Sequence, residues 1–213
     1  MKDKNFYKNY IEAFLKQNAK LNLISKNDEN FLWEKHIYDS LSIGQFFSKY
    51  KIGKTLLDIG AGGGFPSVPV ALTYPEIEVY ALDSIRKKIN AIEELKSELN
   101  INNLHIICDR AENIMQYHCH NYLSNIETSE CKKKFDIITS RAVAPLKVIT
   151  GYAMPLLEKN GYFVAYKSKK ALEEIAEAKT VLKKYNAEII DIIEYDLPLK
   201  ENYERYLIIV KQK

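Results

Sequence analysis

The spacing of apolar residues along the chain changes near residue 50. Before that point apolar residues recur at helical intervals, first over residues 6–17 and again over residues 27–47. After it, short runs rich in β-branched residues alternate with longer amphipathic stretches. The change predicts a helical N-terminal part that is followed by alternating strands and helices.

The alternating part predicts an α/β fold, a mostly parallel sheet with helices on both faces. Strands are expected at residues 55–60, 78–83, 104–109, 135–141 and 161–168, and helices near 66–73, 86–99, 145–156 and 170–185. Two further strand-like runs, 187–197 and 204–212, have no helix between them, so they are expected to pair as an antiparallel hairpin at the sheet edge. Residues 113–134 lack a clean period, and we expect an irregular insertion there. The result is a seven-stranded sheet whose last strand is antiparallel.

Length and charge fit one compact domain with a small extension. The chain has 213 residues, 46% of them hydrophobic, and a net charge of +3. We predict an N-terminal helical extension over residues 1–50 and a main domain over residues 51–213. Clusters of lysine such as residues 132–134 are usually solvated faces, so by themselves they identify no partner.

The cysteines and the apolar runs predict a cytoplasmic chain. Cys108, Cys119 and Cys131 are odd in number and do not have zinc-site spacing, so we expect reduced thiols and no metal site. No apolar run approaches the roughly 20 residues that cross a membrane, and the first residues do not resemble a signal peptide. We therefore expect no membrane partner, and we predict a monomer.

The first expected strand ends in the stretch LLDIGAGGGFPSVP, an apolar run that is followed by glycines. In an open parallel sheet, ligands bind beyond the carboxyl ends of the strands, where glycines allow close approach to the backbone. A dinucleotide fingerprint would need a third glycine where Phe65 stands, and the Gly-Lys-Ser/Thr of a P-loop is missing. The spacing D-x-G-x-G-x-G resembles instead the first motif of Rossmann-like, class I methyltransferases that use S-adenosylmethionine. Its residues here are Asp58, Gly60, Gly62 and Gly64.

Two later positions agree with a nucleoside cofactor. Asp83 ends the second expected strand, where a carboxylate can accept hydrogen bonds from both ribose hydroxyls, although it could also cap the next helix. Ala111 and Glu112 follow the third expected strand, where folds of this class usually bind adenine. Together with the glycine motif, these positions predict S-adenosylmethionine as the cofactor.

The region after the fourth expected strand bears on the methyl acceptor. It reads SRAVAPL, without the N/D-P-P-Y/F motif common in methylation of exocyclic amines, and it holds no cysteine for attack on a pyrimidine ring. A ring nitrogen such as guanine N7 carries a free lone pair, so positioning and electrostatics suffice. Arg141 and Lys167, at the ends of neighbouring strands, suit contacts with phosphate or base edges.

Nearly the whole chain resembles one family, the bacterial small-subunit ribosomal RNA guanine-N7 methyltransferases known as RsmG or GidB. The stretch NLISKNDENFLWEKHIYDSL is similar to the family's N-L-x-S and R-H-x-x-D-S patterns, with Lys35 in place of the usual arginine. The stretches GFPSVPVAL, LDSIRKK, DRAEN, SRAVAPL and YKS then match in order. Ser67 and Ser168 stand where the family usually has glycine, which removes any positive φ at these positions.

The resemblance implies the roles of individual residues. S-adenosylmethionine is expected to bind against Gly60, Phe65, Asp83, Ala111, Glu112 and Arg141. The side of the cleft that faces RNA is expected to hold Arg110, Arg141 and Lys167. Arg141, beside the expected methyl group, is our candidate catalytic residue, with a salt bridge across strand ends as its alternative. His36 is a candidate for RNA contact, with a packed or capping side chain as its alternative.

The resemblance also implies the reaction. It predicts methyl transfer to N7 of a guanine in 16S rRNA, guanine 527 in standard numbering, in a loop near the decoding centre. The partner would be 16S rRNA, the small ribosomal subunit or its assembly intermediate. Two other functions stay open, namely a methyltransferase of the same fold that acts on a small molecule or a protein, and a ribosome-binding relative without catalysis.

Overall fold

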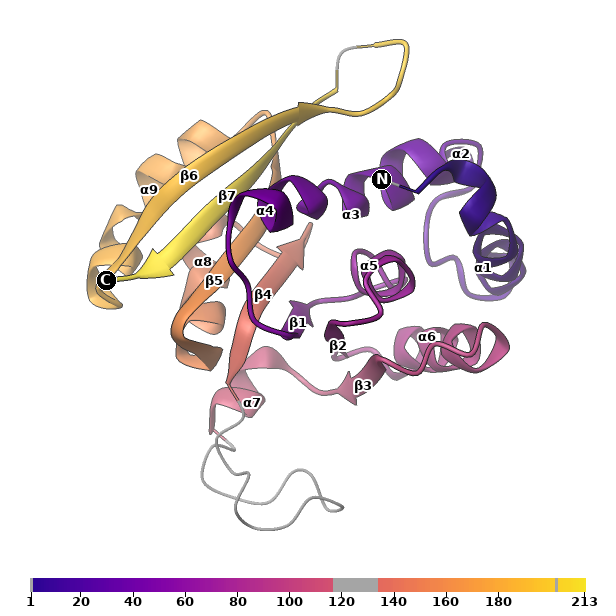
Figure 1. Ribbon diagram of the computed structural model, residues 1–213, viewed down its shortest axis with the longest axis horizontal. Helices are drawn as coiled ribbons and strands as arrows, with labels where there is room; N and C mark the ends of the chain where they lie inside the picture. Colours follow the sequence, from indigo (N-terminus) through magenta and orange to yellow (C-terminus); the bar gives the residue numbers. More distant parts are fainter. Residues whose placement is uncertain (1, 117–133, 202) are drawn as a thin grey trace.

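The computed structural model describes residues 2–116, 134–201 and 203–213, so most of the expected insertion, residues 117–133, lies outside the described residues (Figure 1). Within the described residues, seven strands form one sheet in the order β3-β2-β1-β4-β5-β7-β6. They are β1 (Thr55–Ile59), β2 (Glu78–Asp83), β3 (Leu104–Cys108), β4 (Phe135–Arg141), β5 (Leu157–Ser168), β6 (Ala187–Asp196) and β7 (Glu204–Gln212). The predicted α/β sheet is confirmed.

The direction of the strands decides which loops share an edge of the sheet. Strands β1 to β5 pair in parallel, and β7 pairs antiparallel with both β5 and β6, as expected for the C-terminal hairpin. Because β6 is antiparallel to β7, it runs in the same direction as β1 to β5. The loop after β6 therefore lies at the carboxyl edge of the sheet, where the glycine turn after β1 also lies.

Helices cover both faces of the sheet because the strands are apolar on both sides. The helices of this part are α5 (Ser67–Thr73), α6 (Arg86–Glu98), α7 (Ala111–Gln116), α8 (Leu146–Ala153) and α9 (Ala171–Lys184), with a short 3-10 turn η4 (Met154–Leu156) after α8. Neighbouring residues Leu56 and Leu57 of β1 are both fully buried, one in each of two core clusters. One cluster includes residues of α5 and α6, and the other residues of α7, α8 and α9.

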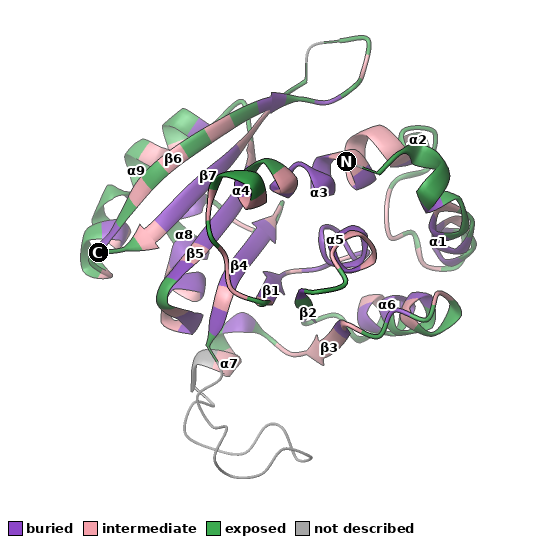
Figure 2. Ribbon diagram, viewed as in Figure 1, coloured by how far each residue is buried: buried purple, intermediate pink, exposed green. Residues whose placement is uncertain are grey.

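The first fifty residues are helical and share a core with the sheet. Their elements are η1 (Lys4–Tyr7), α1 (Lys8–Leu21), α2 (Lys26–Glu29), η2 (Trp33–Tyr38), α3 (Asp39–Leu41) and α4 (Ile43–Lys49). Phe14, Ile37 and Phe46 are fully buried in the same cluster as Leu56 of β1. Figure 2 shows buried residues both in the N-terminal helices and along the strands. The division into an extension and a main domain stays a prediction. No helix in the described ranges has the length and apolarity needed to span a bilayer.

Several expected boundaries were wrong. The expected helix over residues 27–47 is divided into shorter pieces, and η2 is a π-helical segment in which the regular hydrogen-bond spacing widens. We expected the insertion to begin at residue 113, but helix α7 continues to Gln116. It does so because Ala111 and Ile114 pack against the core. Strand β5 begins at Leu157, four residues before the expected start, since Leu157 pairs with Phe135 before the register shifts.

Candidate active site at the carboxyl ends of the strands

A cleft of about 490 Å³ lies at the carboxyl ends of β1, β2, β3 and β4. This volume is within the range of roughly 300–1,000 Å³ that is usual for small-molecule sites. Among the residues that line it are the predicted Gly60, Gly62, Phe65, Asp83, Arg110, Ala111, Glu112, Arg141 and His36. Three predicted residues, Asp58, Gly64 and Lys167, are not part of this lining.

The turn after β1 is built from glycines in the left-handed region. Gly60, Gly62 and Gly64 have φ values of +78°, +58° and +93°. A Cβ at Gly60 would collide with Val143, and a Cβ at Gly64 would lie 2.7 Å from Cγ2 of Val68. The turn therefore requires glycine for both its dihedral angles and its packing, and it presents bare backbone to the cleft.

Asp58 supports this turn from inside the protein. It is fully buried, and its carboxylate accepts hydrogen bonds from the hydroxyl of Thr139 (3.1 Å) and from the backbone N–H (3.3 Å) and hydroxyl of Ser67. Burial raises the pKa of Asp58 to about 6, against the lowering effect of these hydrogen bonds. Ser67 is the first residue of α5 and has no positive φ, so the glycine that the family usually has is not needed here.

Asp83, at the end of β2, binds the same turn from the cleft side. Its Oδ2 accepts from the N–H of Gly62 (2.9 Å), and its Oδ1 accepts from the N–H of Ile85 (2.9 Å). Helix α6 begins at Arg86, and its N-cap is Ile85, so Asp83 is not the capping residue that it could have been. Each carboxylate oxygen can accept a second hydrogen bond, which leaves capacity for a pair of hydroxyl donors.

Asp109, which the sequence analysis missed, is also placed in the cleft. Its Oδ1 accepts from the N–H of Arg110 (2.7 Å) and from the side-chain amide of Asn113 (2.7 Å). Its Oδ2 is buried and has no hydrogen-bond partner among the described residues. A buried acceptor without a partner is costly, so this atom is suited to a donor on a bound ligand. The available signal was its position directly after the third strand, one residue beyond Cys108, which pairs with Asp83.

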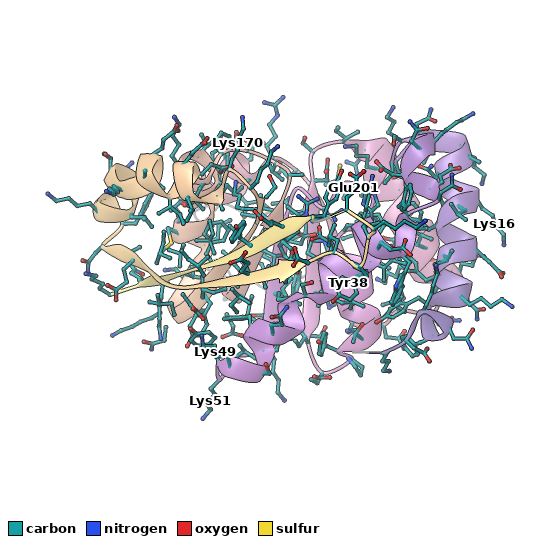
Figure 3. The ribbon with its side chains drawn as sticks, turned by 90° about the horizontal axis from the view of Figure 1, so that it is seen from above. Lys16, Tyr38, Lys49, Lys51, Lys170 and Glu201 are labelled. Carbon is teal, nitrogen blue, oxygen red and sulfur yellow. The ribbon has the colours of Figure 1, made fainter. Side chains whose placement is uncertain are left out.

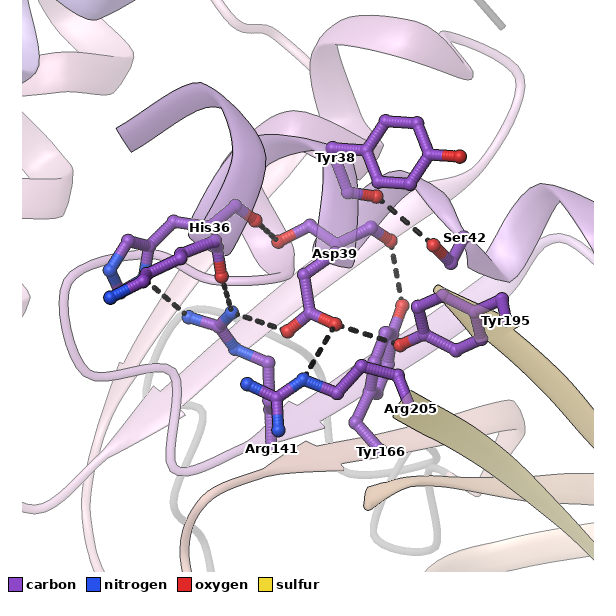
Figure 4. A network of polar contacts seen from close by, with 10 residues as sticks. His36, Tyr38, Asp39, Ser42, Arg141, Tyr166, Tyr195 and Arg205 are labelled. Atoms are coloured by element: carbon purple, nitrogen blue, oxygen red, sulfur yellow. Dashed lines mark hydrogen bonds and ion pairs between the residues drawn. The ribbon is translucent and has the colours of Figure 1, made fainter. Parts of the chain in front are cut away.

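Arg141 joins the cleft to the N-terminal helices (Figure 4). One terminal nitrogen donates to Oδ2 of Asp39 (2.8 Å) and to the carbonyl of Lys35 (3.1 Å), and the other lies 3.1 Å from Nδ1 of His36. The guanidinium carbon is 5.3 Å from the ring centre of Phe65. Arg141 is thus part of the cleft wall and also forms a salt bridge, although its partner lies on helix α3 and not at a neighbouring strand end as the alternative had it.

His36 is a neutral side chain in this arrangement. Burial and the nearby charge of Arg141 lower its pKa to about 4. Because Nδ1 faces an N–H donor of Arg141, we assign the ring proton to Nε2. The Nε2 atom is buried and has no partner among the described residues. His36 therefore lines the cleft with one ring N–H unused, and it is a poor proton acceptor at neutral pH.

Asp39 contacts two cationic side chains and one hydroxyl, and the sequence analysis did not predict these contacts. It is 3% exposed, and besides Arg141 it accepts from the hydroxyl of Tyr195 (2.8 Å) and lies 3.6 Å from Nε of Arg205. These partners come from β4, β6 and β7. Asp39 therefore links the N-terminal helices to three strands of the sheet, of which β4 contributes Arg141 to the cleft.

Lys167 is committed to contacts within the protein. Its ammonium is 2.6 Å from a carboxylate oxygen of Glu174 and donates to the carbonyl of Ala144 (2.8 Å). Its side chain is only 10% exposed. Arg110, in contrast, is exposed where it lines the cleft. The structure therefore brings Arg110 to the cleft but not Lys167.

The order of the strands, the glycine turn after β1 and the acid at the end of β2 define the class of Rossmann-like methyltransferases that use S-adenosylmethionine. Solved structures show the same fold. An O-methyltransferase from Bacillus cereus in complex with SAH aligns with a TM-score of 0.62 at 14% identity, covering 100% of this chain and 93% of that one. An rRNA methylase from Streptococcus thermophilus aligns with a TM-score of 0.54 at 15% identity, covering 81% and 95%.

Sequence comparison identifies the family. The family model described as rRNA small subunit methyltransferase G (GidB) matches residues 3–198. The chain is 35% identical over 212 residues to ribosomal RNA small subunit methyltransferase G of Lactobacillus helveticus, covering 99% of this chain and 83% of the relative. It is 33% identical over 212 residues to the protein of that name from Staphylococcus saprophyticus, covering 100% and 83%. This chain belongs to the rRNA small subunit methyltransferase G family, and the resemblance in its sequence is confirmed.

Proposed function

We propose that this chain transfers a methyl group from S-adenosylmethionine to N7 of a guanine in small-subunit 16S rRNA, guanine 527 in the loop near the decoding centre. One observation carries the proposal: a single cleft combines the glycine turn and two carboxylates with Arg141 and a neutral His36. Membership of the family supports rRNA as the substrate, since the relatives are named ribosomal RNA small subunit methyltransferase G.

The residues of the cleft fit the cofactor. The free acceptor capacity of Asp83 suits the two ribose hydroxyls, and the unpaired Oδ2 of Asp109 suits the amino group of adenine. The turn at Gly60 and Gly62 leaves backbone open to the ligand. When bound, S-adenosylmethionine supplies an electrophilic methyl group on its sulfonium.

The chemistry of guanine N7 matches the other side of the cleft. N7 has a lone pair and no proton, so the reaction needs no base, and a neutral His36 with its proton on Nε2 would not act as one. The neighbouring O6 of guanine is a hydrogen-bond acceptor, which suits donors such as His36 and Arg141.

Arg110 is the cation that we expect to contact RNA phosphate at this cleft, because it is exposed there. Contact with RNA has less support for Lys167, since its ammonium already binds Glu174 and the carbonyl of Ala144. The substrate would be 16S rRNA, free or within the small subunit or its assembly intermediate.

The proposal is tested with small subunits from cells that lack this gene. The protein is incubated with them and labelled S-adenosylmethionine, and the RNA is then cleaved with borohydride and aniline, which cut at N7-methylguanine. Cleavage at the one guanine is the expected result. Incorporation without cleavage would overturn the acceptor atom, and no incorporation into subunits or naked rRNA would favour a small-molecule or protein acceptor or a non-catalytic role.

A further inference from the structure

Two exposed aromatic rings lie close to one lysine near the cleft. Phe31 is 42% exposed and Tyr203 is 38% exposed. The ammonium of Lys35 is 5.0 Å from the ring centre of Phe31 and 5.8 Å from that of Tyr203. The guanidinium carbon of Arg205 is 5.9 Å from the ring centre of Tyr203. We call these four residues the aromatic patch.

Neither ring has a role in the core. Within the described part of the chain, Phe31 and Tyr203 are absent from both core clusters. Phe31 and Lys35 are one helical turn apart, and the N–H of Lys35 donates to the carbonyl of Phe31 (2.8 Å). Asp28 holds the ammonium of Lys35 in place with an ion pair of 2.8 Å. The patch is therefore an organised surface whose two rings are partly open to solvent.

The patch continues the wall of the cleft. Lys35 directly precedes His36, which lines the cleft, and the carbonyl of Lys35 accepts a hydrogen bond from Arg141. Arg205 lies 3.6 Å from Asp39, the carboxylate that also binds Arg141. Figure 3 looks down on this region and shows the loop between β6 and β7 reaching toward the N-terminal helices. Because β6 runs parallel to β1 to β5, this loop belongs to the same edge of the sheet as the cleft.

We propose that the aromatic patch is a stacking platform for an unpaired base of the RNA substrate. The inference rests on the proposed function, which makes the substrate an RNA loop. Unpaired bases in RNA loops stack on aromatic rings, and nearby cations attract the adjoining phosphates. Phe31 and Tyr203 offer the ring surface that the two cations do not cover. Lys35 is paired with Asp28 but its side chain is 26% exposed, unlike that of Lys167, and with Arg205 it adds positive charge beside the rings. The platform would hold a nucleotide near the methylated guanine and so fix the loop in the cleft.

The test uses the full chain with the variants Phe31→Ala, Tyr203→Ala and their combination. We expect the KM for small subunits to rise about tenfold for each single variant, because base stacking on one ring contributes on that scale. The kcat at saturating subunits and the affinity for S-adenosylmethionine should stay unchanged. Tyr203→Phe and Phe31→Tyr keep a ring and should stay within about twofold of the parent chain.

A matched control is Phe6→Ala, which removes a ring that is 46% exposed and lies 3.9 Å from the ammonium of Lys2. It should leave the KM unchanged. An unchanged KM in the double variant, or an equal rise in Phe6→Ala, would overturn the platform. So would a Tyr203→Phe variant as weak as Tyr203→Ala, because the ring itself is the proposed contact.

Filter binding to naked 16S rRNA and to complete subunits separates the remaining outcomes. If the double variant loses affinity for both, the platform is supported. A loss for complete subunits alone would place a ribosomal protein on the patch and overturn the RNA assignment. If the parent chain transfers a methyl group neither to naked 16S rRNA nor to complete subunits, the proposed function fails. In that case the platform fails only if the double variant binds RNA as tightly as the parent chain does.

Discussion

Arg141, at the carboxyl end of β4, forms an ion pair with Asp39 of α3, with 2.8 Å between the guanidinium and the carboxylate. The two residues are 102 positions apart in sequence. Their side chains are only 15% and 4% exposed, so the pair is largely withdrawn from water. The pair therefore fixes Arg141 to the N-terminal helices at the position where it lines the cleft.

Removal of Asp39 is expected to cost far more stability than removal of an exposed carboxylate. Asp39→Ala leaves the charge of Arg141 buried without its partner, and we expect a loss of roughly 3–5 kcal/mol in the free energy of unfolding. The control Asp28→Ala breaks a partly exposed pair with Lys35, for which we expect less than about 1 kcal/mol. Urea unfolding of both variants measures the difference, and equal losses would contradict the structural role of Asp39.

Glycine at position 60 is expected to be necessary for cofactor binding. Gly60→Ala places a Cβ against Val143 at a φ of +78°, so we expect the affinity for S-adenosylmethionine to fall by about tenfold or more. In the control Gly151→Ala, within α8, the added Cβ meets no atom within 4 Å. That variant should bind normally and gain up to about 1 kcal/mol of stability. Calorimetric titration and urea unfolding give both readouts, and normal cofactor binding by Gly60→Ala would refute our view of the turn.

The pKa values of Asp58 and His36 give the stability of the chain opposite dependences on pH. Burial raises the pKa of Asp58 from 3.8 to about 6, so between these values the folded state binds more protons than the unfolded state. The contribution of Asp58 therefore falls as the pH rises. Burial lowers the pKa of His36 from 6.5 to about 4, so in that window the unfolded state binds more protons. The contribution of His36 therefore rises with pH.

Single substitutions should separate the two effects. Relative to the parent chain, Asp58→Asn should gain stability as the pH rises from about 4 to about 6, by up to about 3 kcal/mol. His36→Asn should lose stability relative to the parent as the pH rises from about 4 to about 6.5. Urea unfolding at several pH values measures both differences. A difference that does not change with pH would show that the residue does not titrate as described.

Arg110 and Lys167 are expected to differ in their effect on RNA binding. Arg110 is exposed at the cleft, so Arg110→Gln should reduce the slope of log affinity against log salt by roughly one unit. Lys167 is engaged by Glu174 and Ala144, so Lys167→Gln should lower stability and leave the slope unchanged. Binding to 16S rRNA at several salt concentrations measures the slopes. A larger change in slope for Lys167→Gln would show that its ammonium leaves Glu174 when RNA binds.

The sequence was a good guide to the elements and to several residues that line the cleft. Gly60, Gly62 and Asp83 could be located because each belongs to a short motif at the end of an expected strand, and backbone direction alone then brings them together. The sequence was a poorer guide to Asp58, whose carboxylate faces inward to Thr139 and not into the cleft. A motif gives the position of a residue along the chain but not the direction of its side chain.

The features that depend on local order could be predicted from the residues alone: the alternation of strands and helices, the antiparallel hairpin and the need for glycine after β1. Which charges are free depends instead on tertiary contacts. Packing holds Lys167 against Glu174, pairs Arg141 with Asp39, makes His36 neutral and brings Tyr203 to Lys35. These properties depend on neighbours that are far away in sequence and on the water that packing excludes, and neither follows from the spacing of residues along the chain.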